Sequence, residues 1–195
     1  MIFIPPFGKE AAMTEDEVVR QIGALTRRYY ADDQFSCAEA LVRAFAEVFA
    51  SHRFDPVAVT RLATPFNGGF SELKRTCGVL TGGLLAIGMV AGRDQPADED
   101  AKQEAYTLAQ IFHRRFMDQV QTESCAELLT QWKDQGVNKA HCKRHTAEMA
   151  EMLARTILQV GFHELELDDA DEDEDKDEDN ADDADDAKEK DAAEA

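Results

Sequence analysis

The chain has 195 residues, with 40 acidic and 21 basic side chains and a formal net charge of -19. Most of this excess lies between Asp168 and Ala195, where 17 acidic residues stand against 3 lysines, so the rest of the chain is only mildly acidic. Without a basic stripe, the sequence does not indicate nucleic-acid binding. Its length suits one compact domain with a tail.

The two ends of the chain differ from its middle. Residues 1–13 lack the basic segment of a signal peptide, so we expect an irregular arm on a cytoplasmic protein. From Asp168 onward there is no aromatic residue and no aliphatic side chain larger than alanine. Such a segment cannot bury enough apolar surface to offset the entropy of ordering. We therefore expect residues 166–195 to form a disordered acidic tail.

Residues 14–165 carry apolar side chains at helical spacing, which predicts an all-α domain of six or seven helices in a single bundle. Capping boxes, at Thr14, Ser36 and Ser124, begin three of them. The expected helices are roughly Glu15–Tyr30, Ser36–Phe49, a short one from Asp55-Pro56, Val79–Ala91, 98–120, one from Ser124 to near Gly136, and 138–160. Thr64–Phe70, with its adjacent glycines, is expected to break regular structure.

The central element is the uncharged, glycine-rich run Arg75–Gly92. Its apolar body, Val79–Ala91, is shorter than the about 20 residues that cross a bilayer, so no membrane span is expected. The run predicts a helix buried on nearly every side, with its Gly-x-x-x-Gly pairs at close helix–helix contacts.

Four cysteines stand at or near predicted helix starts. The tetrapeptide Ser-Cys-Ala-Glu occurs twice, around Cys37 and Cys125, with serine as the expected cap and glutamate as its reciprocal partner. Thr76 is the expected cap before Cys77, and Cys142 lies about one turn into the last helix. Helix N-termini favour anions, including the thiolate that ligates metals and attacks disulfides.

These thiols allow several chemistries. Cys37, Cys77, Cys125 and Cys142 together could bind an iron–sulfur cluster, Cys37 and Cys77 could cycle between dithiol and disulfide, or all four could hold zinc. The cysteines could also be buried fillers in a non-enzymatic helical adaptor whose acidic tail docks a basic partner. Whether the chain is an enzyme is left open, and a redox partner protein and a homodimer are both compatible with it.

Other residues point less clearly to a site. His141 and His145 flank Cys142, so one could be a ligand, although a surface histidine pair explains their spacing better. Lys74 and Arg75 would add positive potential near the thiols or would be ordinary surface charges. The sequence contains no haem-attachment motif and no nucleotide fingerprint.

The order of these motifs resembles a known family. The matching parts are Phe-Ser-Cys-Ala-Glu-Ala around Cys37, the loop 64–70, Thr76–Gly83, Ser124–Leu129 and the final Cys142. Over residues 18–160 the chain is similar to the C_GCAxxG_C_C family, bacterial proteins to which redox activity is ascribed, and to the non-haem part of split-Soret cytochromes. The resemblance implies that the four cysteines form the redox site.

Two positions depart from the family pattern. Val79 stands where the family usually has alanine, and Asn67 interrupts the glycine loop. Because asparagine tolerates left-handed backbone geometry, we expect the loop to keep its conformation.

Overall fold

The computed structural model describes residues 13–32, 34–136 and 140–167. The expected irregular arm, apart from Met13, and the expected acidic tail from residue 168 onward lie outside these residues. No helix among those described is long and apolar enough to span a membrane.

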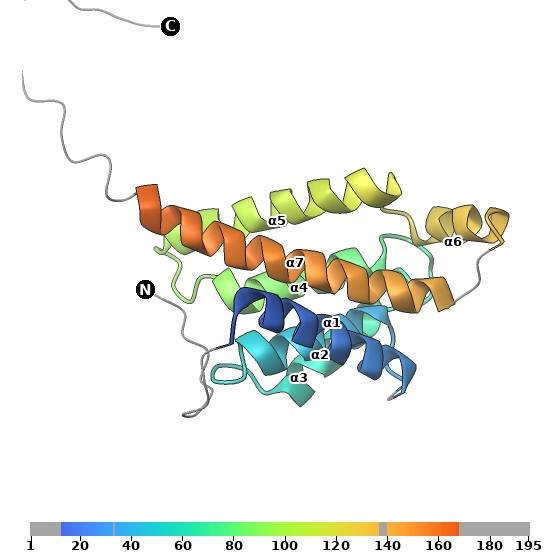
Figure 1. Ribbon diagram of the computed structural model, residues 1–195, viewed down its shortest axis with the longest axis horizontal. Helices are drawn as coiled ribbons and strands as arrows, with labels where there is room; N and C mark the ends of the chain where they lie inside the picture. The colour runs from blue at the N-terminus through green and yellow to red at the C-terminus, as the bar shows by residue number, and fades with distance from the viewer. Residues whose placement is uncertain (1–12, 33, 137–139, 168–195) are drawn as a thin grey trace, which may run out of the picture.

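The described residues form seven α-helices and one 3-10 turn without a β-strand, which confirms the all-α prediction (Figure 1). Thr14 begins the first helix with a complete capping box, and the Asp55 carboxylate caps the third. The last helix was predicted to end near residue 160, but it continues to Leu167. The elements are α1 (Glu15–Ala31), α2 (Cys37–Phe49), α3 (Pro56–Ala63), η1 (Thr64–Phe66), α4 (Gly78–Ala91), α5 (Glu99–Val120), α6 (Cys125–Asp134) and α7 (Ala140–Leu167).

The core lies where α2 and α4 pack together, with α7 across them between α1 and α5 (Figure 1). Apolar side chains recur on the inner faces because the helical period brings every third or fourth residue to the same side. The largest fully buried side chains include Ile22, Leu41, Phe45, Leu80, Ile87, Phe112, Phe116 and Leu153.

Glycines let α4 approach its neighbours closely. A Cβ atom on Gly82 would lie 3.0 Å from the Ala38 Cα atom on α2, and one on Gly83 would lie 2.2 Å from Cε1 of Phe112 on α5. A Cβ on Gly78 would lie 2.5 Å from the Cys37 sulfur. The close contact predicted for the Gly78–Gly82 pair is therefore confirmed.

The outer side of α4 differs from the expectation. Leu84 is 42% exposed, and a Cβ on Gly88 would meet no atom within 4 Å. The prediction that α4 is buried on nearly every side is thus wrong for one stripe, and Gly88 makes no close helix contact.

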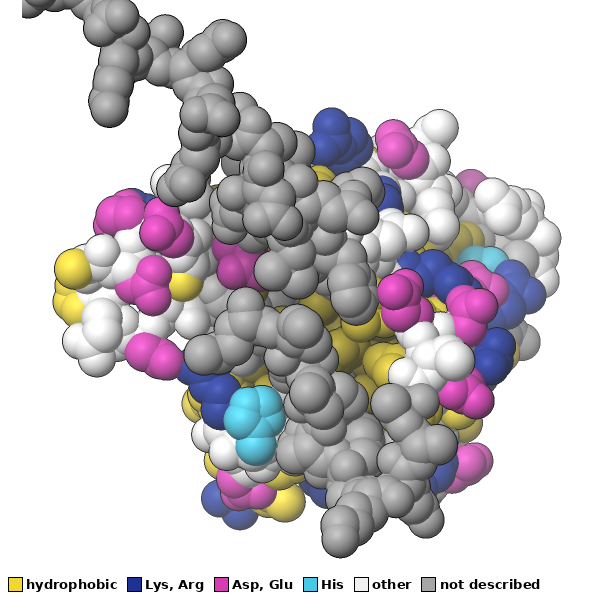
Figure 2. All heavy atoms as spheres, turned by 60° about the vertical axis from the view of Figure 1, so that its left-hand side comes forward, with side chains coloured by type: hydrophobic (Ala, Val, Ile, Leu, Met, Phe, Trp, Pro, Cys, Tyr) yellow, Lys and Arg dark blue, Asp and Glu magenta, His cyan; other side chains and the backbone are white. Residues whose placement is uncertain are grey.

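On the face shown in Figure 2, acidic and basic side chains of the described residues lie interspersed.

The segment between η1 and α4 has an unusual backbone. Five consecutive residues, Gly68 to Glu72, have positive φ angles between 52° and 72°, and Lys74 has one of 59°. Left-handed geometry costs a non-glycine residue about 1 kcal/mol or more. Backbone bonds within the loop hold the segment closed, among them Lys74 N–H to Gly68 O at 3.2 Å and Arg75 N–H to Gly69 O at 3.1 Å.

The packing of α4 gives a matched pair of substitutions on one helix. Gly83→Ala should destabilise the protein by about 1–2 kcal/mol, because overpacking against fully buried Phe112 exceeds the gain in helix propensity. Gly88→Ala should stabilise it by about 0.5–1 kcal/mol, because the new methyl group faces open space. Urea unfolding monitored by circular dichroism measures both, and equal effects of the two substitutions would contradict this packing.

Candidate functional site

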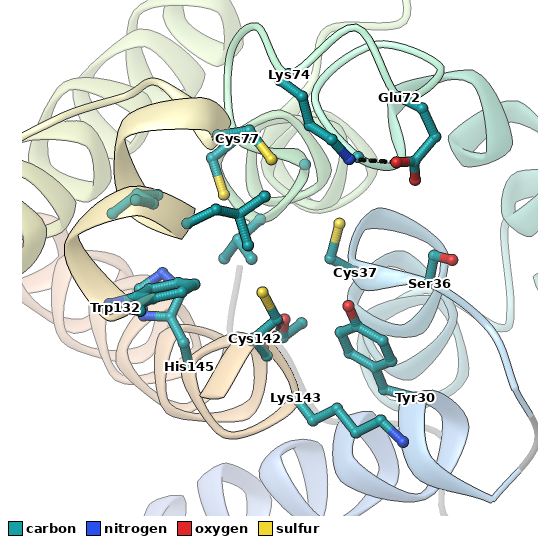
Figure 3. Close-up of a pocket in the computed structure, with 17 residues that line it drawn as sticks. Tyr30, Ser36, Cys37, Glu72, Lys74, Cys77, Trp132, Cys142, Lys143 and His145 are labelled. Atoms are coloured by element: carbon teal, nitrogen blue, oxygen red, sulfur yellow. Dashed lines mark hydrogen bonds and ion pairs between the residues drawn. The ribbon is translucent and has the colours of Figure 1, made fainter. Parts of the chain in front are cut away.

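All four cysteines line one cavity of about 230 Å³ (Figure 3). They reach it from the starts of four helices, α2, α4, α6 and α7. The cavity is also lined by Tyr30, Ser36, Gly68, Glu72, Lys74, Gly78, Val79, Leu128, Leu129, Trp132, Lys143, His145 and Thr146. Thiols up to 105 residues apart in the sequence therefore share a single site.

Cys37 is the first residue of α2, directly after its cap Ser36, as predicted. Its sulfur lies against Gly78, where any larger residue would displace it. Backbone N–H groups of Gly68 and Ala38 lie near this sulfur and favour its thiolate form, which lowers its pKa against the effect of burial. The carbonyl oxygen of the Asn67 side chain accepts from Ala38 N–H at 3.0 Å and so holds the loop against the start of α2.

This contact corrects the expectation for Asn67. Its φ of -62° and ψ of 143° are extended, and the left-handed positions begin only at Gly68. Asn67 is accommodated because its amide oxygen satisfies N–H groups at the start of α2 that would otherwise lack an intrahelical partner.

Backbone pairing brings Cys77 and Cys125 to the same place. Thr76 and Ser124 form an isolated antiparallel bridge. On either side of it, Cys77 N–H donates to Glu123 O and Cys125 N–H donates to Arg75 O, both at 2.7 Å. Each of these two cysteines thus begins its helix directly beside the other's segment.

One expected cap, Thr76, and one expected capping box, at Ser124, differ from the structure. Cys77 itself occupies the N-cap position of α4, since Thr76 is engaged in the bridge. Ser124 caps α6 by accepting from Glu127 N–H at 3.3 Å. However, the Glu127 carboxylate accepts from the Thr122 hydroxyl, and the Ser124 N–H donates to Thr122 and not to Glu127. The capping box expected at Ser124 is therefore only half formed.

Cys142 is the third residue of α7, close to the predicted position near a helix start. The proposed cap Asn138 lies outside the described residues. On an α-helix, residues three apart share a face, so Cys142 and His145 reach the same cavity.

Burial controls the protonation of these thiols. It raises the pKa of Cys77 to about 12, and it also raises those of Cys37 and Cys125. The N–H groups around Cys37, and the Lys74 ammonium near Cys125, oppose this effect. In the absence of a bound metal ion or cluster, burial therefore favours the neutral thiol of Cys77 at physiological pH.

Of the two cations proposed near the thiols, Lys74 reaches the cavity, where its ammonium also pairs with Glu72. Arg75 contributes its backbone carbonyl instead. Lys143 lies on the opposite side of the cavity, with its ammonium 6.0 Å from the Tyr30 ring centroid (Figure 3).

His145 is not the surface residue that its spacing suggested. It is only 3% exposed, between the rings of Phe116 and Trp132, and burial lowers its pKa to about 4. His141 is more exposed and accepts from Arg144 through Nδ1 at 2.7 Å. His145 is therefore an uncharged residue that lines the cavity.

Tyr30 and Trp132 were missed as site residues. Trp132 falls on the apolar face of its helix, where core and cavity aromatics have the same spacing, and Tyr30 was named only as the end of the first expected helix. Tyr30 lies near the end of the helix that precedes Cys37, and this position in the sequence could have indicated that it lies near that cysteine.

As the side chains stand, no group of three or more His, Cys, Asp or Glu residues in the described part is placed to hold one metal ion. The four sulfurs lie around the cavity wall instead of meeting at one point (Figure 3).

The family model described as "Putative redox-active protein (C_GCAxxG_C_C)" matches residues 35–156, a span that contains all four cysteines. The chain belongs to this family. No curated protein and no solved structure matches this chain. Membership in the C_GCAxxG_C_C family confirms the resemblance drawn from the cysteine motifs.

The raised pKa of Cys77 makes stability depend on alkaline pH. In metal-free, reduced protein the unfolded thiol loses its proton near 9.0, whereas the folded thiol keeps it until about 12. Between these values the unfolded state is favoured by up to about 1.4 kcal/mol per pH unit. Urea unfolding from pH 7 to 11 should show this loss, with a smaller slope in Cys77→Ala; identical slopes would contradict the burial effect.

Lys74 should make Cys125 more reactive by favouring its thiolate. In reduced, metal-free protein at pH 8, Lys74→Met should slow alkylation of Cys125 by iodoacetamide several-fold. Lys102→Met, on α5 where the ammonium pairs with Glu99, serves as the control and should leave the rate unchanged. Peptide mass spectrometry measures the rate, and equal rates in the two variants would exclude the Lys74 effect.

Proposed function

We propose that this protein transfers electrons by means of an iron–sulfur cluster held by Cys37, Cys77, Cys125 and Cys142. The observation that carries the proposal is that four thiols from four helix starts line one cavity. An iron–sulfur cluster takes up and releases single electrons when bound to cysteine thiolates.

The donor set fits such a group. Thiolates in this cavity are disfavoured by burial, and a bound cationic cluster would replace their protons and offset that cost. Sulfurs spread around a cavity suit a cluster, which presents several iron atoms, better than a single zinc ion, which needs four ligands around one point.

The chain's own groups would stabilise the negative charge of this site. N–H groups of Gly68 and Ala38 favour the thiolate of Cys37, and those of Val79 and Leu80 favour the thiolate of Cys77. Hydrogen bonds to ligand sulfurs favour the more negative, reduced state and so raise the reduction potential. Leu128, Leu129 and Trp132 limit the access of water.

A dithiol–disulfide cycle of Cys37 and Cys77 is the second candidate. It is favoured by the position of the Cys37 sulfur against Gly78, the residue next to Cys77. In this reaction the two thiols lose two protons and two electrons to an oxidant of the disulfide class, and one S–S bond forms. Because the Cys77 pKa is about 12, Cys37 would be the attacking sulfur.

The helical adaptor has less support, since buried filler cysteines would have no reason to share one cavity. A docking role for the acidic tail concerns residues that lie almost wholly outside those described.

Anaerobic purification tests the cluster directly. We expect iron and acid-labile sulfide in similar amounts and a broad visible absorption that bleaches with dithionite. Serine substitution at any of the four cysteines should remove most of the iron, because each supplies one thiolate. Thr130→Ser, at an exposed position of the same helix as Cys125, is the control and should keep it.

A colourless protein that stays free of iron after anaerobic reconstitution would sink the cluster proposal. Free-thiol counts before and after mild oxidation then decide the second candidate. A loss of two thiols, mapped to Cys37 and Cys77, would support the disulfide cycle, and an unchanged count would exclude it.

A further inference from the structure

Tyr30 presents a hydroxyl group to the sulfur site from a helix that carries no cysteine. It lies one residue before the end of α1, and its ring is partly buried in the cavity wall. Figure 3 shows the hydroxyl directed into the cavity between Cys37 and Cys142. The Lys143 ammonium faces the ring, so the phenol lies between a cation and the sulfurs.

Burial and the four cysteines together determine the electrostatic environment of this hydroxyl. Burial first, and then the charges of Cys37, Cys142, Cys77 and Cys125, raise the pKa of Tyr30 above its ordinary value. A tyrosine hydroxyl with its ordinary pKa of about 10 already carries its proton at physiological pH, so it can act as a hydrogen-bond donor. Cys37 and Cys142 contribute more to this shift than Cys77 and Cys125, in agreement with the position of the hydroxyl beside the first two in Figure 3.

The neighbouring tyrosine has a different environment. The Tyr29 hydroxyl donates to the Glu47 carboxylate on α2, and its ring is buried against Phe35 and Ala40. Of these two adjacent tyrosines on one helix, Tyr29 thus bonds to a carboxylate, whereas Tyr30 faces the cysteines. This contrast supplies a matched control, since each can lose its hydroxyl without losing its ring.

We propose that the Tyr30 hydroxyl donates a hydrogen bond to a sulfur of the site and thereby raises its reduction potential. The inference rests on the cluster function proposed above. When the site accepts one electron from a low-potential one-electron donor, its negative charge increases by one. A donor hydrogen bond to sulfur stabilises that more negative state. Tyr30 keeps its proton in this step, and no covalent bond forms or breaks.

Tyr30→Phe tests the hydrogen bond with little change in packing. Wild-type protein, Tyr30→Phe and Tyr29→Phe are purified without oxygen, their iron and sulfide are quantified, and their midpoint potentials are measured by optical redox titration at constant pH. We expect a lower midpoint in Tyr30→Phe and an unchanged one in Tyr29→Phe. A purely structural role for Tyr30 would alter iron content or stability but would not shift the midpoint.

A second variant covers the case in which Tyr30→Phe fails to fold or to hold iron. The chain has three tyrosines, so in a Tyr29→Phe, Tyr106→Phe background Tyr30 is the only one left. Incorporation of 3-fluorotyrosine there makes the phenol a stronger donor at almost the same size, and the midpoint should rise.

The outcomes separate this inference from the proposed function. Wild-type protein that binds no iron overturns both. Wild-type protein with a cluster, but with an unchanged midpoint in Tyr30→Phe or in the fluorotyrosine protein, overturns the role of Tyr30 alone.

Discussion

The site depends on a short stretch of backbone pairing between two loops. Lys74–Cys77 and Glu123–Ala126 exchange three hydrogen bonds, of which the pair on either side of the Thr76–Ser124 bridge is the shortest at 2.7 Å. These bonds position the starts of α4 and α6 relative to each other. They also satisfy N–H groups at the first residues of both helices, which have no intrahelical partner. Because the donors include Cys77 and Cys125, the pairing that joins the loops also places two of the four sulfurs.

The remaining contacts attach α2 to this pair. Left-handed geometry from Gly68 to Glu72 turns the chain back toward α2, where the Asn67 amide oxygen meets the N–H of Ala38 and the Gly68 N–H meets the Cys37 sulfur. The absence of a Cβ at Gly78 leaves room for that sulfur. Several helix starts then converge on one cavity, so the positive ends of their dipoles act together on any negative charge there. Backbone strain in the loop is the local cost of this convergence.

Much of the architecture could be predicted because helix periodicity and capping are local properties. The helix beginning at Glu15 and the position of Cys37 after Ser36 follow from residues a few places apart. The Thr76–Ser124 bridge could not be predicted, since it joins segments 48 residues apart and its threonine is typical of a helix cap. His145 was misjudged for a similar reason, because the basic residues beside it suggested a surface, whereas Phe116 and Trp132 come from other helices. All four cysteines lie at or near the start of a helix, and this shared position did indicate the site from the sequence. Only the packing of the helices, which the sequence does not show, brings the four cysteines to one cavity.

The distribution of the four cysteines along the chain constrains how the protein matures. Cys37 and Cys142 enclose most of the helical residues, and the first three cysteines cannot complete the cavity until α7 has packed between α1 and α5. Cys142 is the last of the four thiols to be synthesised, so the cavity can be completed only once the start of α7 has been made. A group bound by all four would then join the two ends of the bundle, and its loss would loosen the contacts of α7 with the rest of the fold. Binding of such a group would therefore be coupled to the docking of α7 onto the other helices.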